Sequence, residues 1–417
     1  MIYIYKFIGI ILIPLIKLKV RNRIKDGKEI KERYKERFGL SKLSLSNNKN
    51  VIWIHAASVG EFKSADYLIT KYHNKFNILI TTTTVSAAFY ANKHYGDKII
   101  HQFAPLDVSI WVKRFLKKWK PSLIIWIESD LWPTTLHIAK NQKIKAILIN
   151  LRLSPKSLKR WSFLPSFYNQ ILGSFNQIFA QSKIDKERVS LLSKRNINFI
   201  GNLKLTNLNF SINKNIKIEK KKDSHLITIM LSSTHYNEES QLLTIFKKFL
   251  DKKYKIRLII APRHPERSNE IILLCRKNNL SSHLESKKTQ NNDSIMIIDS
   301  FGILSKYFLI SDIVFVGGSL IAAGGHNPIE PAVQKCAILT GPHLFNWQDI
   351  YNQMILEKAC LKIENLKDLE IQIKNLINDK EQIENMKIKS YNFSKKQIVD
   401  TSYLDKVIDE HMNLNIC

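Results

Sequence analysis

Two acidic residues in the first half of the chain follow short apolar segments and could do acid–base chemistry. Glu61 lies in WIHAASVGEF (53–62), and Glu128 lies in WIESDLWP (126–133). A carboxylate that faces a cleft after a Ser-Val-Gly turn suits a general base acting on a hydroxyl group. A glutamate that interacts with the positive end of a helix dipole would occupy the same position. Both interpretations of Glu61 stay open, and Glu128 is a second acid that could converge with it.

A glycine-rich segment in the second half is typical of a site where a ligand approaches the backbone. FVGGSLIAAGGHNPIEPAVQ (315–334) contains four of the 13 glycines of the chain. Glycines admit a ligand close to the main chain, and free N–H groups at the helix start expected near Pro328 would attract a phosphate. Asn327 and Glu330 could bind a ribose diol. A tight turn that needs glycine for its geometry alone is the alternative. The pattern is neither GxGxxG nor GxxxxGK[ST], which disfavours a dinucleotide or Walker-type site.

Other polar groups follow neighbouring apolar segments of the second half. In IIAPRHPER (259–267), Arg263 offers a planar guanidinium fork to phosphate oxygens, and His264 could add a donor. The hydroxyl groups of LSSTH (231–235) could reach the same phosphate, and the backbone of DSFGIL (299–304) could wall a base pocket. A surface turn with an incidental arginine is the alternative for Arg263. The candidates at the phosphate also include Ser233, Gly317, Gly318 and Ser319.

The elements that must position these residues are parallel strands. Short apolar, β-branched segments alternate with polar helical stretches, which predicts a doubly wound α/β architecture. The expected strands are 51–56, 76–82, 98–103, 122–128, 145–150, 176–182 and 196–201, then 226–233, 257–262, 295–299, 312–318 and 337–342. A charged run at 212–225 separates the two halves, a helix is expected at 238–250, and amphipathic helices follow from about 362. Because ligands of open parallel sheets bind beyond the carboxyl ends of the strands, nearly all the polar motifs fall where a site is expected.

Composition narrows the partners that the chain could bind. Its 417 residues are enough for two to three domains. Four scattered cysteines without a CxxC pair indicate a reducing compartment and argue against a disulfide framework or a zinc site. The formal charge of +29 suits an anionic partner, although the Lys-, Ile- and Asn-rich composition accounts for part of it. No RNA-binding signature or zinc finger accompanies the charge, so we predict no nucleic-acid partner.

The N-terminal segment indicates an anionic membrane surface as a partner. Residues 1–16 are apolar except for Lys6, and they are fewer than the ~20 that a spanning helix needs. The run 17–39 holds ten Lys or Arg against four acids, which suits an anionic cytoplasmic leaflet. A short signal anchor or an interfacial helix fits, and both leave the rest of the chain cytoplasmic. A buried first helix is the structural alternative.

Eight segments resemble, in their order, the bacterial 3-deoxy-D-manno-octulosonic acid (Kdo) transferases of lipopolysaccharide assembly. They are HAASVGEF, TTTTVS, WIESDLWP, NLRLS, GNLK, STH, PRHPER and GGHNPIEPA, and KERFG at 35–39 is similar to that family's segment after its anchor. The resemblance runs from about residue 30 to about 345. It implies a GT-B fold, with two Rossmann-like domains around a cleft, the acceptor in the N-terminal half and the donor nucleotide in the C-terminal half. It also implies inverting transfer of Kdo from the co-substrate CMP-Kdo to a lipid A precursor, lipid IVA, without a cofactor or a metal.

The resemblance further implies roles for individual residues. Glu61 matches the family's proton acceptor, and Glu128 and Lys204 match residues that stabilise the transition state. The residues that match the CMP-binding segments are Pro262, Arg263, His264, Phe301, Gly302, Ile303, Leu304, Asn327, Pro328, Ile329 and Glu330. Where the family commonly reads Gly-Glu-Leu, this chain reads Gly-Ile-Leu at 302–304, so only backbone contacts to the donor are expected there.

These expectations divide the chain into four parts. They are a membrane anchor or interfacial helix at 1–20, an acceptor domain at 21–211, a linker at 212–225, and a CMP-sugar domain with C-terminal helices at 226–417. GT-B chains often return their C-terminal helices to the N-terminal half, and that option stays open here. The expected location is the cytoplasmic side of the inner membrane. The rival interpretations are a GT-B enzyme that uses a UDP-sugar and a membrane-tethered basic binding protein without catalysis.

Overall fold

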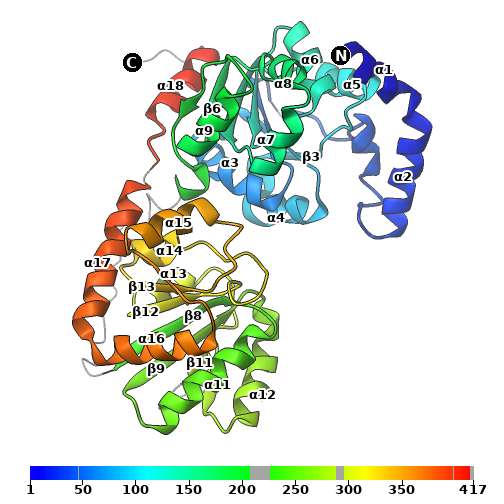
Figure 1. Ribbon diagram of the computed structural model, residues 1–417. Helices are drawn as coiled ribbons and strands as arrows, with labels where there is room; N and C mark the ends of the chain where they lie inside the picture. Colours follow the sequence, from blue (N-terminus) through cyan, green and yellow to red (C-terminus); the bar gives the residue numbers. More distant parts are fainter. Residues whose placement is uncertain (46, 207–225, 288–294, 398, 414–417) are drawn as a thin grey trace. The chain divides into compact units, whose positions relative to one another are not determined.

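The computed structural model describes residues 1–45, 47–206, 226–287, 295–397 and 399–413 (Figure 1). The chain divides into two compact units, Met1–Asn209 with Ile398–Cys417, and Phe210–Gln397. Each unit is built on a seven-stranded sheet whose neighbouring strands run parallel. The predicted α/β class with two Rossmann-like sheets is therefore confirmed. The expected linker at 212–225 lies outside the described residues.

The first unit has the strand order β3-β2-β1-β4-β5-β6-β7. Its strands are β1 (Val51–His55), β2 (Asn77–Thr82), β3 (Ile100–Phe103), β4 (Leu123–Ile127), β5 (Lys145–Leu151), β6 (Gln177–Ala180) and β7 (Asn198–Phe199). Its helices are α1 (Ile2–Ile11), α2 (Ile13–Lys25), α3 (Val59–Tyr72), α4 (Val85–Tyr95), α5 (Ser109–Trp119), α6 (Pro133–Asn141), α7 (Pro155–Trp161), α8 (Pro165–Leu172) and α9 (Lys183–Ser190), with short 3-10 turns η1 (Tyr34–Phe38), η2 (Gly96–Lys98) and η3 (Leu203–Leu205). The strand order reverses between β1 and β4, which is the switch point where ligands bind in sheets of this kind.

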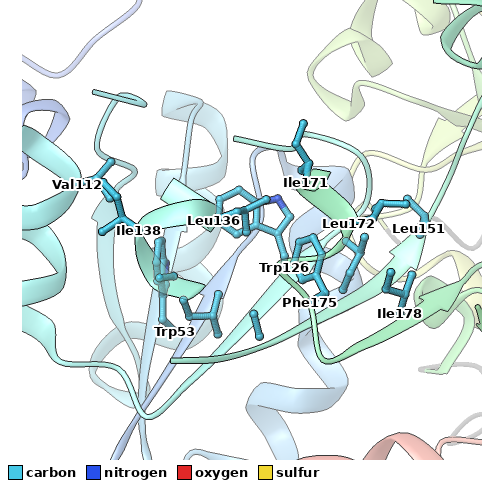
Figure 2. Close-up of a cluster of buried hydrophobic side chains, with 14 of the residues drawn as sticks. Trp53, Val112, Trp126, Leu136, Ile138, Leu151, Ile171, Leu172, Phe175 and Ile178 are labelled. Carbon is cyan, nitrogen blue, oxygen red and sulfur yellow. The ribbon is translucent and has the colours of Figure 1, made fainter. Parts of the chain in front are cut away.

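The core of this unit forms around two tryptophans from the strands at the switch point. Trp53 and Trp126 are buried with their ring centroids 5.9 Å apart, and Leu136 and Phe175 lie in the same cluster (Figure 2). The Trp53 indole N–H donates to Oγ1 of Thr81 at 2.8 Å. Because a buried indole N–H needs a partner, this bond joins the cluster to the neighbouring strand β2 near its carboxyl end.

The second unit repeats the architecture with the order β10-β11-β9-β8-β12-β13-β14. Its strands are β8 (Ile227–Thr234), β9 (Ile256–Pro262), β10 (Ser282–Leu284), β11 (Ile295–Ile297), β12 (Ile313–Val316), β13 (Ala337–Thr340) and β14 (Leu361–Lys362). Its helices are α11 (Glu238–Asp251), α12 (Ser268–Lys277), α13 (Leu304–Phe308), α14 (Ile329–Val333), α15 (Gln348–Leu356), α16 (Leu366–Asn378) and α17 (Lys380–Lys396), with the 3-10 turn η4 (Pro265–Arg267). The strand order reverses between β8 and β12. All the strands expected from the sequence are present, and the short edge strands β10 and β14 are additional.

The last helix, α18 (Ser402–His411), packs on the first unit. Asp405 accepts hydrogen bonds from the hydroxyl of Tyr67 on α3 at 2.6 Å and from Thr401 at 3.0 Å, and its carboxylate lies 2.8 Å from Nζ of Lys71. The Tyr403 ring contacts Phe179 of β6. The chain therefore returns to its N-terminal half, and the expected range of 226–417 for the C-terminal domain includes a helix that belongs to the first unit.

The two N-terminal helices carry nine exposed large apolar side chains. α1 packs against α5 and α6 (Figure 1). The rings of Tyr3 on α1 and His137 on α6 lie edge to face, with their centroids 5.7 Å apart. Among the residues described, no helix is both long enough and apolar enough to span a bilayer.

Candidate functional site

Glu61 lies in the first turn of α3, directly after β1. Ser58 caps this helix by accepting a hydrogen bond from the N–H of Glu61 at 3.3 Å, and Oε2 of Glu61 accepts one from the N–H of Ala57 at 2.6 Å. This exchange is a variant of the capping box that a Ser-x-x-Glu sequence forms. The carboxyl group is thus fixed at the carboxyl edge of the sheet, close to the switch point. An acid at the start of a helix and a general base at the edge of the sheet would both occupy this position, so the geometry agrees with both interpretations of Glu61.

The electrostatic environment of Glu61 suits proton transfer near neutral pH. Burial raises the pKa of its carboxyl group to about 7, and repulsion from Glu128 and Asp130 acts in the same direction. The N–H of Ala57 and the ammonium group of Lys204 partly offset this rise. A general base is most effective when its pKa lies near the working pH, so this carboxyl is well tuned for accepting a proton from a hydroxyl group.

Glu128 and Lys204 form a close ion pair beside this carboxyl. Oε1 of Glu128 lies 2.5 Å from Nζ of Lys204, and the two side chains are 15% and 25% exposed. Glu128 follows β4 in a left-handed conformation with φ of 62°, which is unusual for a residue with a Cβ and is typical of functional positions. The structure therefore brings together Glu61, Glu128 and Lys204, the three residues to which the family resemblance assigns catalytic roles.

Asn150 holds this arrangement in place, and sequence reasoning did not assign it a role. It is fully buried within β5, near the end of that strand. Its Oδ1 accepts the N–H of Leu203 at 3.0 Å, and its Nδ2 lies 3.4 Å from Oε1 of Glu128. Leu203 begins the short turn η3 that carries Lys204. One amide side chain thus connects Glu128 to the turn that supplies its cation. The sequence signal that could have indicated Asn150 is the polar segment NLRLS (150–154) at the end of a strand.

His55 and Asp130 form a second pair at the same sheet edge. His55 is fully buried, its Nδ1 lies 2.9 Å from Oγ1 of Thr81, and its Nε2 has no hydrogen-bond partner within the described part of the chain. That Nε2 faces Oδ2 of Asp130 at 3.9 Å. Burial lowers the pKa of His55, so the ring is neutral at pH 7. For Asp130, burial raises the pKa, but His55 and Trp132 together lower it below its usual value. Asp130 is therefore ionised at pH 7, and it lies close enough to Glu61 to raise the pKa of that carboxyl.

In the second unit, basic side chains gather at the carboxyl ends of β8, β9 and β12. Nε2 of His235 lies 2.8 Å from Nε2 of His326, and the two rings are stacked with an angle of 7° between their planes. The ring of His264 approaches His235 edge-on at 6.3 Å. Burial lowers the pKa of His326 to about 4, and the charges of His235, Arg263 and His264 contribute. The pKa of His235 is lowered as well, chiefly by burial, so both imidazoles are neutral at pH 7 and one can donate a hydrogen bond to the other. Sequence reasoning chose Arg263 and His264 but gave no role to the imidazoles of His235 and His326.

The glycines after β12 approach other parts of the chain. A Cβ on Gly317 would lie 2.7 Å from the carbonyl oxygen of Ser233, and one on Gly318 would lie 3.1 Å from the ring of His326. These positions need glycine because a neighbouring strand end and an imidazole occupy the space. The glycine pair is therefore explained by close packing in a tight turn, which was the alternative to ligand contact.

The amide groups after the glycines are occupied by a carboxylate of the protein. Glu238, fully buried at the start of α11, accepts the N–H groups of Gly318 at 2.8 Å, Ser319 at 3.1 Å and Leu320 at 3.0 Å. It also accepts the N–H of His235 at 3.1 Å. The N–H groups of the candidate residues Gly318 and Ser319 are therefore not free to bind a phosphate. Ser319 is buried and donates its hydroxyl to the carbonyl of Val316 at 2.6 Å.

The other donor-site candidates lie on turns at the same edge of the second sheet. Pro262 ends β9, Ile303 precedes α13, and Leu304 begins it. Phe301 is 62% exposed, and Gly302 has φ of 85°. Nδ2 of Asn327 donates to Oε1 of Glu330 at 3.1 Å, and Oδ1 of Asn327 accepts the N–H of Ile329 at 3.0 Å. Pro328 caps α14, which confirms the helix start expected there.

Within the described ranges of the chain, no group of three or more His, Cys, Asp or Glu side chains has an arrangement that could hold a metal ion.

Comparison with known proteins identifies the family. A family model described as 3-deoxy-D-manno-octulosonic-acid transferase (kdotransferase) matches residues 32–207. The 3-deoxy-D-manno-octulosonic acid transferase of Rickettsia bellii is 32% identical over 424 aligned positions, which cover 99% of this chain and 99% of that protein. The chain belongs to the Kdo transferase family. As a Kdo transferase it is a glycosyltransferase enzyme, as the ordered motifs predicted.

Solved structures are similar to this Kdo transferase in fold. The UDP complex of MnaA from S. aureus is 12% identical, with a TM-score of 0.55 over 88% of this chain and 98% of that chain. At this identity the likeness concerns the fold alone. The C-terminal CMP-Kdo binding domain of WaaA from Acinetobacter baumannii is 30% identical and covers 40% of this chain and 89% of that domain, with a TM-score of 0.39.

Proposed function

We propose that this Kdo transferase moves Kdo from CMP-Kdo to a hydroxyl group of a lipid A precursor, lipid IVA, in lipopolysaccharide assembly, with inversion at the anomeric carbon. The carboxyl group of Glu61 carries the proposal. It is partly buried at the switch point, its pKa is raised to about 7, and it lies in the field of the Glu128–Lys204 ion pair. A carboxyl group with these properties is suited to removing a proton from an alcohol at physiological pH.

The proposed step forms one bond and breaks another at the same carbon. The acceptor oxygen bonds to the anomeric carbon of Kdo from the face opposite CMP, and the bond from that carbon to the CMP phosphate oxygen breaks. The electron pair of the broken bond leaves with CMP, and the hydroxyl proton goes to Glu61. Lys204, held by Glu128 at 2.5 Å, stabilises negative charge that develops in the transition state.

The second unit is proposed to hold the CMP-Kdo donor. Support comes from the guanidinium group of Arg263 and the three imidazoles of His235, His264 and His326, which gather at one sheet edge and could donate hydrogen bonds to phosphate oxygens. A bound phosphate would favour the protonated form of these imidazoles. The turns at 301–304 and 327–330 follow β11 and β12 of the same sheet and are proposed to contact the base and the ribose of CMP.

A membrane surface is the proposed place of the reaction, on the cytoplasmic side of the inner membrane. Support comes from α1 and α2. Phe7 and Leu15 are 64% and 63% exposed, and the basic residues of α2 follow directly. An apolar face flanked by lysine and arginine suits the boundary between head groups and acyl chains.

A turnover assay tests the proposal. Purified protein in detergent is mixed with CMP-Kdo and a tetra-acylated lipid A precursor, and the lipid is followed by mass spectrometry. We expect Kdo mass increments that disappear in Glu61→Gln and persist in Glu187→Gln, a matched change at an exposed residue of α9. Loss of Glu61 as the base should lower the rate by about 10²–10⁴-fold.

The nucleotide requirement separates this proposal from a transferase that uses a UDP-sugar. We expect CMP to raise the melting temperature of the protein and UDP to leave it unchanged. Transfer that survives in Glu61→Gln would remove Glu61 from the mechanism. Protection by UDP alone would contradict the donor.

A further inference from the structure

The N-terminal helices carry two apolar faces with different surroundings. The outer face consists of Ile4, Phe7, Ile11 and Leu15, which follow helical spacing and are between 59% and 64% exposed. The inner face consists of Tyr5, Ile8, Leu12 and Ile16, one position later along the chain. The inner face lines a cavity of about 610 Å³ within the first unit. Ligand pockets commonly measure ~300–1,000 Å³, so this cavity has the size of a binding site.

The cavity has an apolar wall and a polar wall. Val108 and Trp132 continue the apolar inner face, while Arg23, Arg37, Thr83 and Asp130 lie on the polar side. Nε of Arg23 lies 2.9 Å from Oε1 of Glu29, and Nη2 of Arg37 lies 3.1 Å from Oε2 of the same carboxylate. Two guanidinium groups thus share one carboxylate. With Lys19, Asp107 and Asp130, the charged side chains that line the cavity number three of each sign. An apolar wall beside such a polar wall of mixed charge complements an amphiphile with an acyl chain and a polar head of hydroxyl and phosphate groups.

Ala57 connects the polar wall of the cavity to Glu61, the proposed base. The hydroxyl of Thr83 donates to the carbonyl oxygen of Ala57 at 2.8 Å, and the N–H of Ala57 donates to Oε2 of Glu61 at 2.6 Å. Asp130, which also lines the cavity, faces His55 at the same sheet edge. A ligand in the cavity would therefore present its polar part to the region of Glu61.

The far wall is fixed rather than loosely packed. Asp107 accepts the N–H groups of Thr134 at 3.0 Å and Thr135 at 2.7 Å, which ties the start of α6 to the residues between β3 and α5. The apolar side chains of the inner face remain partly exposed against this wall, with Tyr5 and Leu12 at 39% and Ile8 at 48%. The cavity is thus a built feature whose apolar surface is not covered by the described parts of the chain.

We propose that this cavity binds one acyl chain of the acceptor, an acylated sugar phosphate, and so selects acceptors by their acylation. The chain lies along the inner face, and the sugar phosphate contacts the polar wall beside Glu61. The outer face then contacts the bilayer, while the inner face receives the lipid that reacts. This inference rests on the proposed function for the identity of the acceptor.

Variants with larger side chains in the cavity test this proposal, and the same kind of substitution outside the cavity is their control. Ile8→Trp and Gly9→Leu introduce bulk into the cavity, and an added Cβ on Gly9 meets only the carbonyl oxygen of Asp107, at 3.8 Å. Ile371→Trp makes the same substitution at an exposed residue of α16, in the second unit. We expect the two cavity variants to raise the KM for a tetra-acylated acceptor by about tenfold or more, as steric exclusion from an apolar pocket does. The KM for a deacylated sugar phosphate should stay the same in all variants, and Ile371→Trp should match the unmodified protein with both acceptors.

Photo-crosslinking gives a readout that does not depend on turnover. The full chain in detergent is labelled with a lipid A precursor that carries a diazirine on one acyl chain, and adducts are mapped by mass spectrometry. We expect adducts on Ile8, Leu12 and Trp132, and their loss in Gly9→Leu. An excess of unlabelled precursor should compete, and a diazirine-labelled phosphatidylglycerol should label only the outer face.

The possible outcomes separate this inference from the proposed function. Kdo transfer with unchanged KM in the cavity variants, together with adducts confined to the outer face, would overturn the inference and leave the transferase standing. Equal cavity labelling by phosphatidylglycerol would also overturn it, because the cavity would then take any bilayer lipid. Adducts on the cavity residues without any Kdo transfer would support the acyl site and contradict the proposed function.

Discussion

At the scale of single residues, Glu61 meets two opposing requirements. It must be ionised to accept a proton, yet burial and the neighbouring carboxylates of Glu128 and Asp130 raise its pKa to about 7. The folded protein therefore holds a proton on Glu61 more tightly than the unfolded chain does. For a carboxyl group with a raised pKa, stability falls as the pH increases from the unfolded value, ~4.3, to about 7, and the loss is complete above that window.

Replacing this carboxyl by a neutral amide should consequently stabilise the protein at high pH. We expect Glu61→Gln to raise the free energy of unfolding by about 1–3 kcal/mol at pH 8, since one pKa unit corresponds to ~1.4 kcal/mol. At pH 4.5 the two proteins should be nearly equal, because Glu61 is then protonated in the folded state. Calorimetry at both pH values measures the difference. Glu187→Gln on α9 should show no such crossover, and a less stable Glu61→Gln at pH 8 would contradict the raised pKa.

At the scale of elements, the sequence predicts what is local and misses what depends on distant contacts. Continuous apolar, β-branched runs predict the central strands because both faces of those strands are buried. The edge strands β10 and β14 escape prediction because they are short and only partly buried. Glu61 and Glu128 are predictable, since each follows a strand. The contact of Glu238 with the amides of Gly318 and Ser319 is not predictable from pattern, because it joins residues 80 and 81 positions apart.

The return of α18 to the first unit has a testable consequence for the helix that carries Glu61. Asp405 is 8% exposed and binds Tyr67 and Lys71, both on α3. Removing a buried, charged hydrogen-bond partner costs about 1.5–3 kcal/mol. We expect Asp405→Ala to increase hydrogen exchange in both α18 and α3, as measured by mass spectrometry of the full chain. Lys406→Ala, on the exposed side of α18, is the matched control and should leave exchange unchanged. If α3 kept its protection in Asp405→Ala, α18 would not be stabilising that helix.

At the scale of the whole molecule, the charge of +29 is spread along the chain, and the basic residues of α2 directly follow the exposed apolar side chains of α1. On α2, Lys17, Arg21 and Lys25 recur every four residues and are exposed, so they lie on one side of the helix. They do not line the cavity of the inner face. If charge alone held the protein on a membrane, any exposed group of lysines would serve equally. If α1 and α2 hold it, this group matters more than others of the same size.

Two variants with the same change in charge distinguish these possibilities. Lys17, Arg21 and Lys25 replaced together by Gln should weaken binding to vesicles of 30% phosphatidylglycerol by about 100-fold at low salt, because each basic residue near such a surface contributes ~1 kcal/mol. Lys367, Lys374 and Lys380 replaced by Gln, on exposed positions of α16 and α17, should leave the affinity within about twofold. Vesicle flotation at 50 and 500 mM salt measures the binding of both variants.

Added salt should weaken binding of the unmodified protein to the vesicles. A residual, salt-resistant fraction should persist through Phe7, Ile11 and Leu15, because apolar insertion is not screened by ions. Equal losses in the two triple variants would show that net charge governs binding, and the N-terminal helices would then lose their assigned role.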